Sequence, residues 1–340
     1  MPARLALVSI ILAGAIALLV IFGRSPRDSR PEPAGAGNAA TTPPPALPAP
    51  PPSAAREPAG ELAGDPERLR RRLYELLGEP LEGNDVRERM EKIIAHRAAL
   101  DELLALLGPE DVDLIAEMLA GEWNFLDRRA MLRRLGEIGT DHAANLLVEH
   151  YWTLAAAGVE TELNYTIEAL GTVQSPHSFT LLTDLIGTEH TYHHRFRFVE
   201  QLGRHRDNIQ AVPTFLRVAD SANEDYFKTR SRAALALKWA DDPRSAPQVE
   251  RLLDSEQDNY VRQALCGTLG ELGDPASVGK LAAIARTDTN HQTRMSAIRA
   301  LSRIGGDDAR GVIEELRESD GHERVRLEAT RALEQMDENG

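Results

Sequence analysis

Cysteine is almost absent from this sequence of 340 residues, in which Cys266 is the single example. One cysteine excludes a disulfide framework within the chain and a metal centre built from several thiolates. Aromatic residues make up only 5% of the chain, and Ala and Leu dominate the apolar residues. This composition favours helices packed through aliphatic side chains over a β-sandwich. We expect Cys266 to lie in the core.

A positive net charge is limited to the first 60 residues. The net charge is −14 for the whole chain, and residues 1–60 carry a net charge of +2, so residues 61–340 carry −16. Non-specific nucleic-acid binding needs a basic surface that displaces counterions. We therefore expect no nucleic-acid partner. The acidic body favours solubility, with a basic partner as the alternative interpretation.

Motifs of the common catalytic sites are missing as well. The sequence contains no HExxH, GxSxG or GxGxxG. Residues 273–281 resemble a phosphate-binding loop, but one residue too many separates the glycines, and Leu281 stands where Ser or Thr would hold Mg²⁺. We interpret this stretch as a turn of a repeat.

Histidines gather in one stretch, at His190, His193, His194 and His205. His190 and His194 are four residues apart, but a transition metal needs three or four convergent ligands. We expect no metal, no cofactor and no catalysis. An enzyme, or an enzyme subunit, that uses a metal or cofactor is the alternative.

The longest apolar run, residues 5–23, has no charged side chain. A helix of this length spans a bilayer core of about 30 Å. A cleaved signal peptide is usually shorter in its apolar part and is followed by a small-residue cleavage site. We therefore expect residues 1–24 to be a retained signal anchor in the inner membrane, with the C-terminal domain outside the cytoplasm.

A proline-rich segment follows the apolar run. Residues 31–60 contain ten of the 20 prolines, and Ala and Gly fill most of the rest. Such a segment cannot build a core and is typical of disordered, polyproline-like linkers. We predict a spacer over residues 25–64, a helical cap over 65–120, a repeat domain over 121–336 and a tail over 337–340.

The strongest signal is a repeat. Leucines near helix ends recur at intervals of 32 or 35 residues, and they are Leu135, Leu170, Leu202, Leu237, Leu269, Leu301 and Leu333. A period in this range, built only from helical patterns, is typical of stacked helical hairpins. We predict an all-α, right-handed α-solenoid.

Arginine recurs seven residues before these leucines, with Leu163 as the one exception. The arginines are Arg128, Arg195, Arg230, Arg262, Arg294 and Arg326. We interpret them as an internal ladder, in which each stem packs on its helix and each guanidinium bonds a carbonyl or an acid of the adjacent repeat. A basic strip for an acidic ligand is the alternative.

Each repeat is expected to hold a first helix, such as residues 259–272, and a second helix, such as 276–286. Asp242-Pro243 and Asp274-Pro275 predict starts of second helices, and Asp65-Pro66 and Asn84-Asp85 predict starts of two earlier helices. Residues 142–157 predict a longer second helix. Residues 323–336 predict a final first helix with no second helix after it.

The stretch DNYVRQALCGTLGELGDPASVGKLAAIAR and its successor RMSAIRALSRIGGDDARGVIEEL resemble HEAT repeats of the short bacterial type first described in phycobilin lyases. The resemblance covers residues 225–336 clearly and residues 125–224 more loosely. It implies the fold and says little about function.

One catalytic family is built from similar repeats. Deoxyhypusine hydroxylase carries His-Glu pairs that ligate two irons, directly after the position that is Arg here. In this chain those two residues are Ser231-Arg232, Gln263-Ala264, Met295-Ser296 and Leu327-Glu328. None is His-Glu, so the resemblance does not extend to a di-iron site.

Aromatic residues are concentrated between Trp123 and Tyr260, so these repeats have either bulkier cores or an aromatic binding surface. Candidate contacts with a partner are Trp123, Tyr151, Trp152, Tyr192 and Trp239. We predict a membrane-tethered scaffold that binds a protein or peptide on its concave face, through the second helices of the central repeats. A structural anchor that self-associates through residues 85–107 is a further alternative.

Overall fold

The computed structural model describes residues 62, 64–189 and 192–339, and this part of the chain contains helices and no strand. The predicted all-α fold is confirmed for these residues. The chain divides into two units, Met1–Arg56 and Glu57–Gly340. The predicted anchor, residues 5–23, and almost all of the predicted spacer, residues 25–64, lie outside the described residues. Among the helices that are described, none is both long and apolar enough to span a bilayer.

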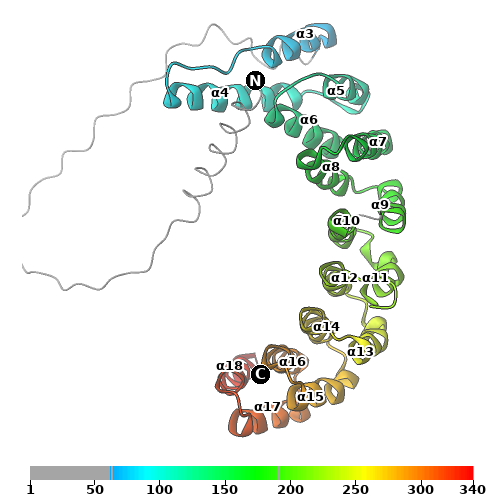
Figure 1. Ribbon diagram of the computed structural model, residues 1–340, viewed down its shortest axis with the longest axis vertical. Helices are drawn as coiled ribbons and strands as arrows, with labels where there is room; N and C mark the ends of the chain where they lie inside the picture. The colour runs from blue at the N-terminus through cyan, green and yellow to red at the C-terminus, as the bar shows by residue number, and fades with distance from the viewer. Residues whose placement is uncertain (1–61, 63, 190–191, 340) are drawn as a thin grey trace, which may run out of the picture. The chain divides into compact units, whose positions relative to one another are not determined.

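Helices of the second unit stack in two layers along an open, curved row (Figure 1). The inner helices are α6 (Phe125–Ile138), α8 (Glu160–Thr172), α10 (Tyr192–Arg204), α12 (Phe227–Ala240), α14 (Asn259–Leu272), α16 (His291–Ile304) and α18 (Glu323–Asn339). The outer helices are α5 (Val112–Leu119), α7 (Asp141–Ala157), α9 (Pro176–Thr188), α11 (Val212–Ala219), α13 (Ala246–Ser255), α15 (Val278–Thr287) and α17 (Asp307–Ser319).

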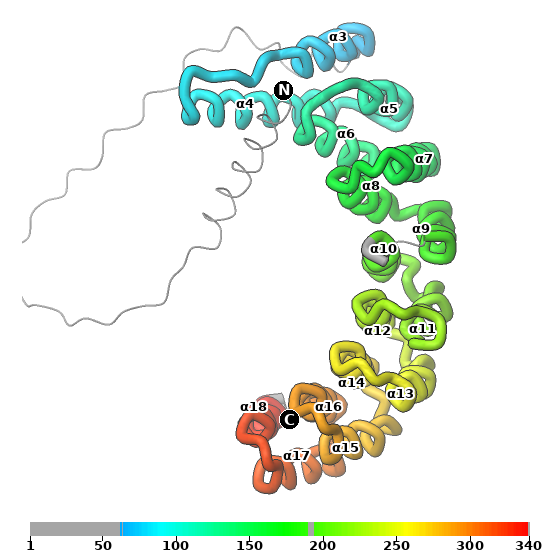
Figure 2. The backbone as a smooth tube through the Cα atoms, in the orientation of Figure 1, coloured from blue at the N-terminus to red at the C-terminus, as the bar shows by residue number. Residues whose placement is uncertain are grey.

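The first helix of each predicted hairpin is an inner helix, and it lies on the concave side of the row (Figure 2). Successive inner helices pack closely on one another, whereas successive outer helices contact each other sparsely. Because the inner layer is the tighter one, the row bends toward it. The expectation that second helices form the concave face is therefore wrong.

Helix α14 illustrates why the repeats fold as they do. Asp258 caps its N-terminus by accepting from the backbone N–H groups of Tyr260 and Val261. Gly273 ends it with a left-handed φ of 67°, which glycine adopts without strain. The buried stripe of α14 includes Leu265, Cys266 and Leu269, so the predicted core position of Cys266 is confirmed.

The inner helices approach closely where a small residue faces another. A Cβ at Gly270 would lie 2.6 Å from the Cα of Ala300 on α16, and one at Gly136 would lie 2.5 Å from the carbonyl oxygen of Ala169 on α8. Glycine at these positions is thus required by the contact between neighbouring inner helices.

The predicted helix starts agree with the structure in most places. Asp65 and Asp85 cap α3 (Pro66–Leu77) and α4 (Val86–Leu104). Asp242 and Asp274 cap short 3-10 turns, Pro243–Ser245 and Pro275–Ser277, that lead into α13 and α15. Two further 3-10 turns, Pro109–Asp111 and Asn208–Ala211, lead into α5 and α11. The longer second helix is confirmed as α7.

Candidate functional site

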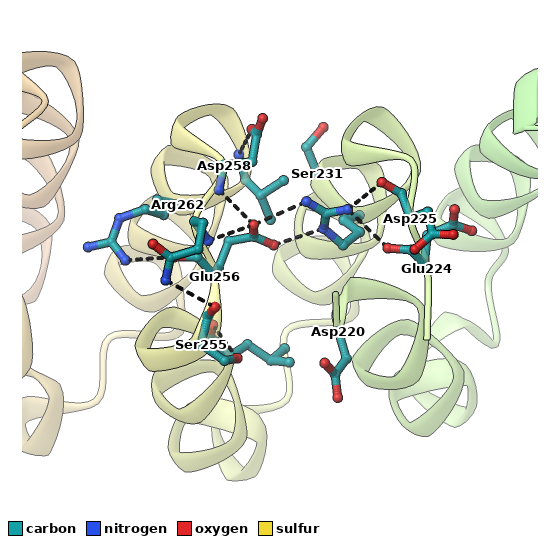
Figure 3. A network of polar contacts seen from close by, with 12 residues as sticks. Asp220, Glu224, Asp225, Ser231, Ser255, Glu256, Asp258 and Arg262 are labelled. Carbon is teal, nitrogen blue, oxygen red and sulfur yellow. Dashed lines mark hydrogen bonds and ion pairs between the residues drawn. The ribbon is translucent and has the colours of Figure 1, made fainter. Parts of the chain in front are cut away.

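The repeat arginines form a ladder between successive repeats. Arg230 donates from Nε and Nη2 to the carboxylate of Glu256, at 2.8 and 3.1 Å, and from Nη1 to the carbonyl oxygens of Glu224 and Asp225, at 3.0 and 2.7 Å (Figure 3). Glu256 precedes the next inner helix, so one guanidinium joins two repeats.

The ladder acids from Glu224 onward also organise their own loops, because each carboxylate accepts from the backbone N–H two residues later. A carboxylate oxygen of Glu256 accepts from the N–H of Asp258 at 2.8 Å, and its carbonyl oxygen accepts from Arg262 at 3.0 Å. The same pattern of side-chain and main-chain bonds recurs toward the C-terminus. The carboxylate partners are Glu162 for Arg128, Glu224 for Arg195, Glu256 for Arg230, Asp288 for Arg262 and Asp320 for Arg294, and Arg326 donates to the carbonyl of Asp320.

These arginines are structural. The side chains of the five arginines in ion pairs are between 9% and 19% exposed, and their partner carboxylates are at most 8% exposed. Desolvated ion pairs of this kind are stable only when hydrogen bonds satisfy the remaining donors and acceptors, which the loop contacts do. The predicted ladder is confirmed, and its guanidinium groups are committed to the fold.

The ladder changes where Leu163 replaces the arginine. The acid before α10 is Glu189, and Tyr151 of the outer helix α7 donates its hydroxyl to that carboxylate. The hydroxyl oxygen of Tyr151 also lies 3.0 Å from Nδ1 of His194. Burial, followed by the contact with Glu189, raises the pKa of Tyr151, so this phenol stays protonated and acts as the donor.

The five predicted contact aromatics do not form one surface. Tyr151 is 1% exposed, so its prediction as an exposed contact is wrong. Trp123 is partly buried and donates to the carbonyl of Met118 at 2.6 Å. Trp152 is 43% exposed on the outer helix α7. Trp239 is partly buried on the inner helix α12, and the side chain of Tyr192 lies outside the described residues.

Charge separates the two layers in the central repeats. Inner helices α10, α12, α14 and α16 contain 11 Arg or Lys and 2 Asp or Glu residues. Outer helices α9, α11, α13 and α15 contain 4 Arg or Lys and 3 Asp or Glu residues. Ladder arginines account for four of the 11, so seven basic side chains remain on inner helices whose exposed side faces the concave side of the row. The inner layer from α10 to α16 is therefore basic although the whole protein is acidic.

Three arginines surround Glu200 on this surface. Arg204 lies 2.8 Å from its carboxylate, Arg232 3.6 Å and Arg197 4.0 Å. The guanidinium carbon of Arg232 lies 4.6 Å from the ring centroid of Phe196, and that of Arg204 lies 5.9 Å from the ring of Trp239. The guanidinium carbon of Arg197 also lies 5.9 Å from the ring of Phe196, so one carboxylate faces three cations that are all placed against aromatic rings.

A second cluster continues toward the C-terminus. Glu271 on α14 lies 2.8 Å from Nζ of Lys238 on α12 and 3.4 Å from Nε of Arg303 on α16. The hydrogen bond from Lys238 lowers the pKa of Glu271, so this carboxylate stays ionised. Glu271 and Arg303 line an open cavity of about 580 Å³ with Gly305, Gly306 and other residues at the C-terminal ends of α14, α16 and α18.

We call the basic and aromatic side chains of these two clusters the inner patch, and its members are Phe196, Arg197, Arg204, Arg232, Lys238, Trp239 and Arg303. Sequence reasoning selects only Trp239 among them. The signal that could have found the others is the charge of each helix, because net charge over the whole chain averages the inner layer with the acidic loops and outer helices.

Three other features of the described residues, a cavity, an apolar stripe and the histidines, lie outside the inner patch. An open cavity of about 480 Å³ lies between α5 and α7 on the outer side, with Arg128 and His150 in its lining. Val86, Met90 and Ile94 form an exposed apolar stripe on α4, within residues 85–107, for which self-association stays a prediction. His205 is buried. Among the described residues no three His, Cys, Asp or Glu side chains gather as a metal site would need, and His190 lies outside them.

Comparison with known proteins supports the repeat assignment. A sequence model described as HEAT repeats matches residues 192–266 and 255–334. No curated protein matches the chain.

Two solved structures resemble the chain weakly. One is human deoxyhypusine hydroxylase in complex with glycerol, at 17% identity and a TM-score of 0.34, covering 83% of this chain and 100% of the other. The other is the complex of CpcE and CpcF of phycocyanin lyase from Nostoc, at 16% identity and a TM-score of 0.33, covering 80% of this chain and 98% of the other.

Proposed function

We propose that this protein is an interaction scaffold, without catalysis of its own, whose inner helices bind a protein or peptide partner through the inner patch. The observation that supports this is the set of exposed arginines with partly exposed aromatic rings on the concave side of a repeat array. Repeat arrays create extended concave surfaces of this kind, and Arg and Trp are enriched among residues that dominate binding energy at interfaces.

The N-terminal part of the sequence adds a location to this proposal. Residues 5–23 act as a retained membrane anchor, and residues 25–64 as a proline-rich spacer that holds the repeat domain away from the bilayer. The repeat domain then works outside the cytoplasm. The apolar length of the anchor and the proline content of the spacer support this part.

A capture experiment with the full-length protein in detergent tests the proposal. The inner double variant Arg204→Glu/Arg303→Glu changes two side chains that are 60% and 46% exposed. The outer double variant Arg217→Glu/Arg251→Glu makes the same charge change at exposed positions of α11 and α13. We expect wild type and the outer variant to retain a protein that the inner variant loses. Equal capture by all three proteins would contradict the proposal.

A further inference from the structure

The inner patch has more positive charge than its own acids neutralise. Glu200 faces Arg197, Arg204 and Arg232, and Glu271 faces Lys238 and Arg303, so each carboxylate is outnumbered. Arg204 is 60% exposed and Arg197 is 39% exposed. This excess is local, because residues 61–340 together carry −16. A surface of this sign, on a protein of the other sign, attracts acidic groups to one place.

Arg232 has hydrogen-bond donors that the described residues leave unused. Its Nε is buried and has no hydrogen-bond partner among the described residues. Its guanidinium lies over Phe196, and its contact with Glu200 is long, at 3.6 Å. A guanidinium presents five donors in a fixed fork that matches a carboxylate. The side chain of Arg232 is 24% exposed, so the exposed part of its guanidinium, and not the buried Nε, has capacity to bind a further acidic group.

Beside the inner patch, Gly267 leaves open space into which the main chain of a ligand could fit. Gly267 lies in the middle of α14, four residues before Glu271, and thus on the same helix face. A Cβ built at Gly267 would meet nothing within 4 Å, in contrast to Gly270, where it would meet Ala300. Glycine in a helix interior costs stability relative to alanine. Packing within the protein does not require glycine at position 267, so the open space there is available to a ligand.

We propose that the inner patch binds an acidic segment of a partner protein in extended conformation, with its carboxylates on the arginines and its main chain over Gly267. This inference rests on the proposed scaffold function. Packed helices lie about 8–10 Å apart, and an extended chain rises about 3.3 Å per residue. A segment that crosses successive inner helices therefore meets a new one at about every third residue, so acidic residues fit best at that spacing.

A nucleic acid is the other polyanion that a basic and aromatic surface can bind. Its phosphates lie close together along the whole strand, and binding depends on an extended basic track. Here Glu200 and Glu271 interrupt the basic side chains within the patch itself. A protein segment with spaced carboxylates avoids both acids, whereas a continuous phosphate backbone passes over them.

Fluorescence anisotropy with defined probes tests the partner class on the full-length protein in detergent. The probes are four repeats of Glu-Ser-Gly, the same peptides with Gln or Lys in place of Glu, and a single-stranded oligothymidine. We expect the Glu peptide to bind wild type and to weaken strongly between about 50 and about 500 mM NaCl, since screening shortens to a few ångströms. The Gln and Lys peptides should bind at least about tenfold more weakly.

Variants locate the binding. Arg204→Glu/Arg303→Glu should weaken the Glu peptide by about tenfold or more, and Arg217→Glu/Arg251→Glu should not change it. Gly267→Leu places a good helix former in open space, so it should keep the fold, checked by circular dichroism, and still weaken the peptide. Gly267→Ala, a smaller change, serves as its matched control.

Each outcome decides between the two proposals. Equal binding of the Glu and Gln peptides, or unchanged binding in the inner double variant, overturns the acidic-segment inference. Tighter binding of the oligothymidine overturns it in favour of a nucleic acid. If the inner variant loses a captured protein but no probe peptide binds wild type, the scaffold function stands and the partner class is wrong. If the peptide binds but capture is the same for all variants, the scaffold proposal fails.

Discussion

From α10 to α18 the repeats are joined by one recurring contact, whereas from α6 to α9 each junction has its own. In the C-terminal region an arginine reaches an acid 26 or 29 residues later. In the N-terminal region Arg128 binds Glu162, which is 34 residues later and also lies 3.2 Å from Nε2 of His150. At the next junction Tyr151 of the outer helix α7 donates a hydrogen bond to Glu189. The regular region is also where the HEAT-repeat model matches.

The difference shows how a solenoid tolerates loss of its repeat residue. The guanidinium of Arg230 makes four hydrogen bonds to two segments of the chain. Removal of one partner of such a buried ion pair destabilises the protein, because the other charge stays buried without a partner. A phenol makes one bond to the acid and brings no charge into the core. Where Leu163 stands in place of the arginine, the neutral donor of Tyr151 still binds the buried carboxylate of Glu189, so the stack continues without an arginine at position 163.

Removal of a ladder arginine should have the largest effect. Arg230→Ala leaves Glu256, which is 2% exposed, without its cation. We expect a loss of about 3–5 kcal/mol in the free energy of unfolding, as for other broken buried pairs. Urea unfolding of the full-length protein in detergent, followed by circular dichroism, measures it. A loss below about 1 kcal/mol would show that the ladder does not hold the regular region together.

Two glycines of one helix should respond in opposite directions. Gly270→Ala forces a Cβ against Ala300 and should destabilise the protein by about 1–3 kcal/mol. Gly267→Ala meets open space and should stabilise it by up to about 1 kcal/mol through helix propensity. Thermal unfolding of both variants beside wild type gives the signs. Two changes of the same sign would contradict the close contact between α14 and α16.

The substitute joint should be weaker than a ladder joint. Tyr151→Phe removes the hydroxyl that donates to Glu189 and keeps the ring in the core. We expect a loss of about 1.5–3 kcal/mol, the usual range for a hydrogen bond to a charged group. Measured in the same urea series, this loss should be smaller than that of Arg230→Ala. An equal or larger loss would erase the distinction between the two regions.

Acid should loosen the stack in two stages. Burial lowers the pKa of His205, which accepts from the N–H of Asp207 through Nδ1. Its neutral form is favoured in the folded state, so stability is full above the unfolded pKa of about 6.5 and declines as pH falls below it. Unfolding midpoints between pH 8 and pH 5 should show this decline in wild type and less of it in His205→Gln.

The second stage belongs to the ladder acids. Burial opposes ionisation of Asp320, but hydrogen bonds from Arg294 and from the N–H of His322 hold its pKa below the usual value. Its stabilising effect is therefore complete above the unfolded pKa of about 4 and is lost as pH falls from there through the folded pKa. Absence of any further decline below about pH 4 would contradict the charged state of the ladder.

A surface ion pair should matter least. Arg286 on α15 and Glu315 on α17 are joined at 2.6 Å but are 40% and 48% exposed. Arg286→Ala should change the free energy of unfolding by at most about 1 kcal/mol, because solvent screens exposed pairs. This variant is the matched control for Arg230→Ala. A comparable loss in both would mean that burial does not set the strength of these contacts.

Much of the fold was predictable because local rules agree with the tertiary packing. The cap at Asp258 and the turn at Gly273 set the bounds of α14 as expected, and the arginine register predicted the ladder. The binding aromatics were not predictable in the same way. Tyr151 and Trp152 are adjacent in the chain, yet one is buried and the other exposed, because only the packing of α7 against its neighbours decides which side of the helix is covered.

By itself, the sequence determined that hairpins of helices recur about every 33 residues and that an arginine stands at one register in all but one of them, since hydrophobic period and capping act within a short stretch of chain. Only the tertiary structure decided which layer is concave, because curvature depends on how closely inner helices such as α14 and α16 approach. It also decided that Arg197, Arg204 and Arg232 meet around Glu200. Charges from separate helices become one surface only when the repeats stack.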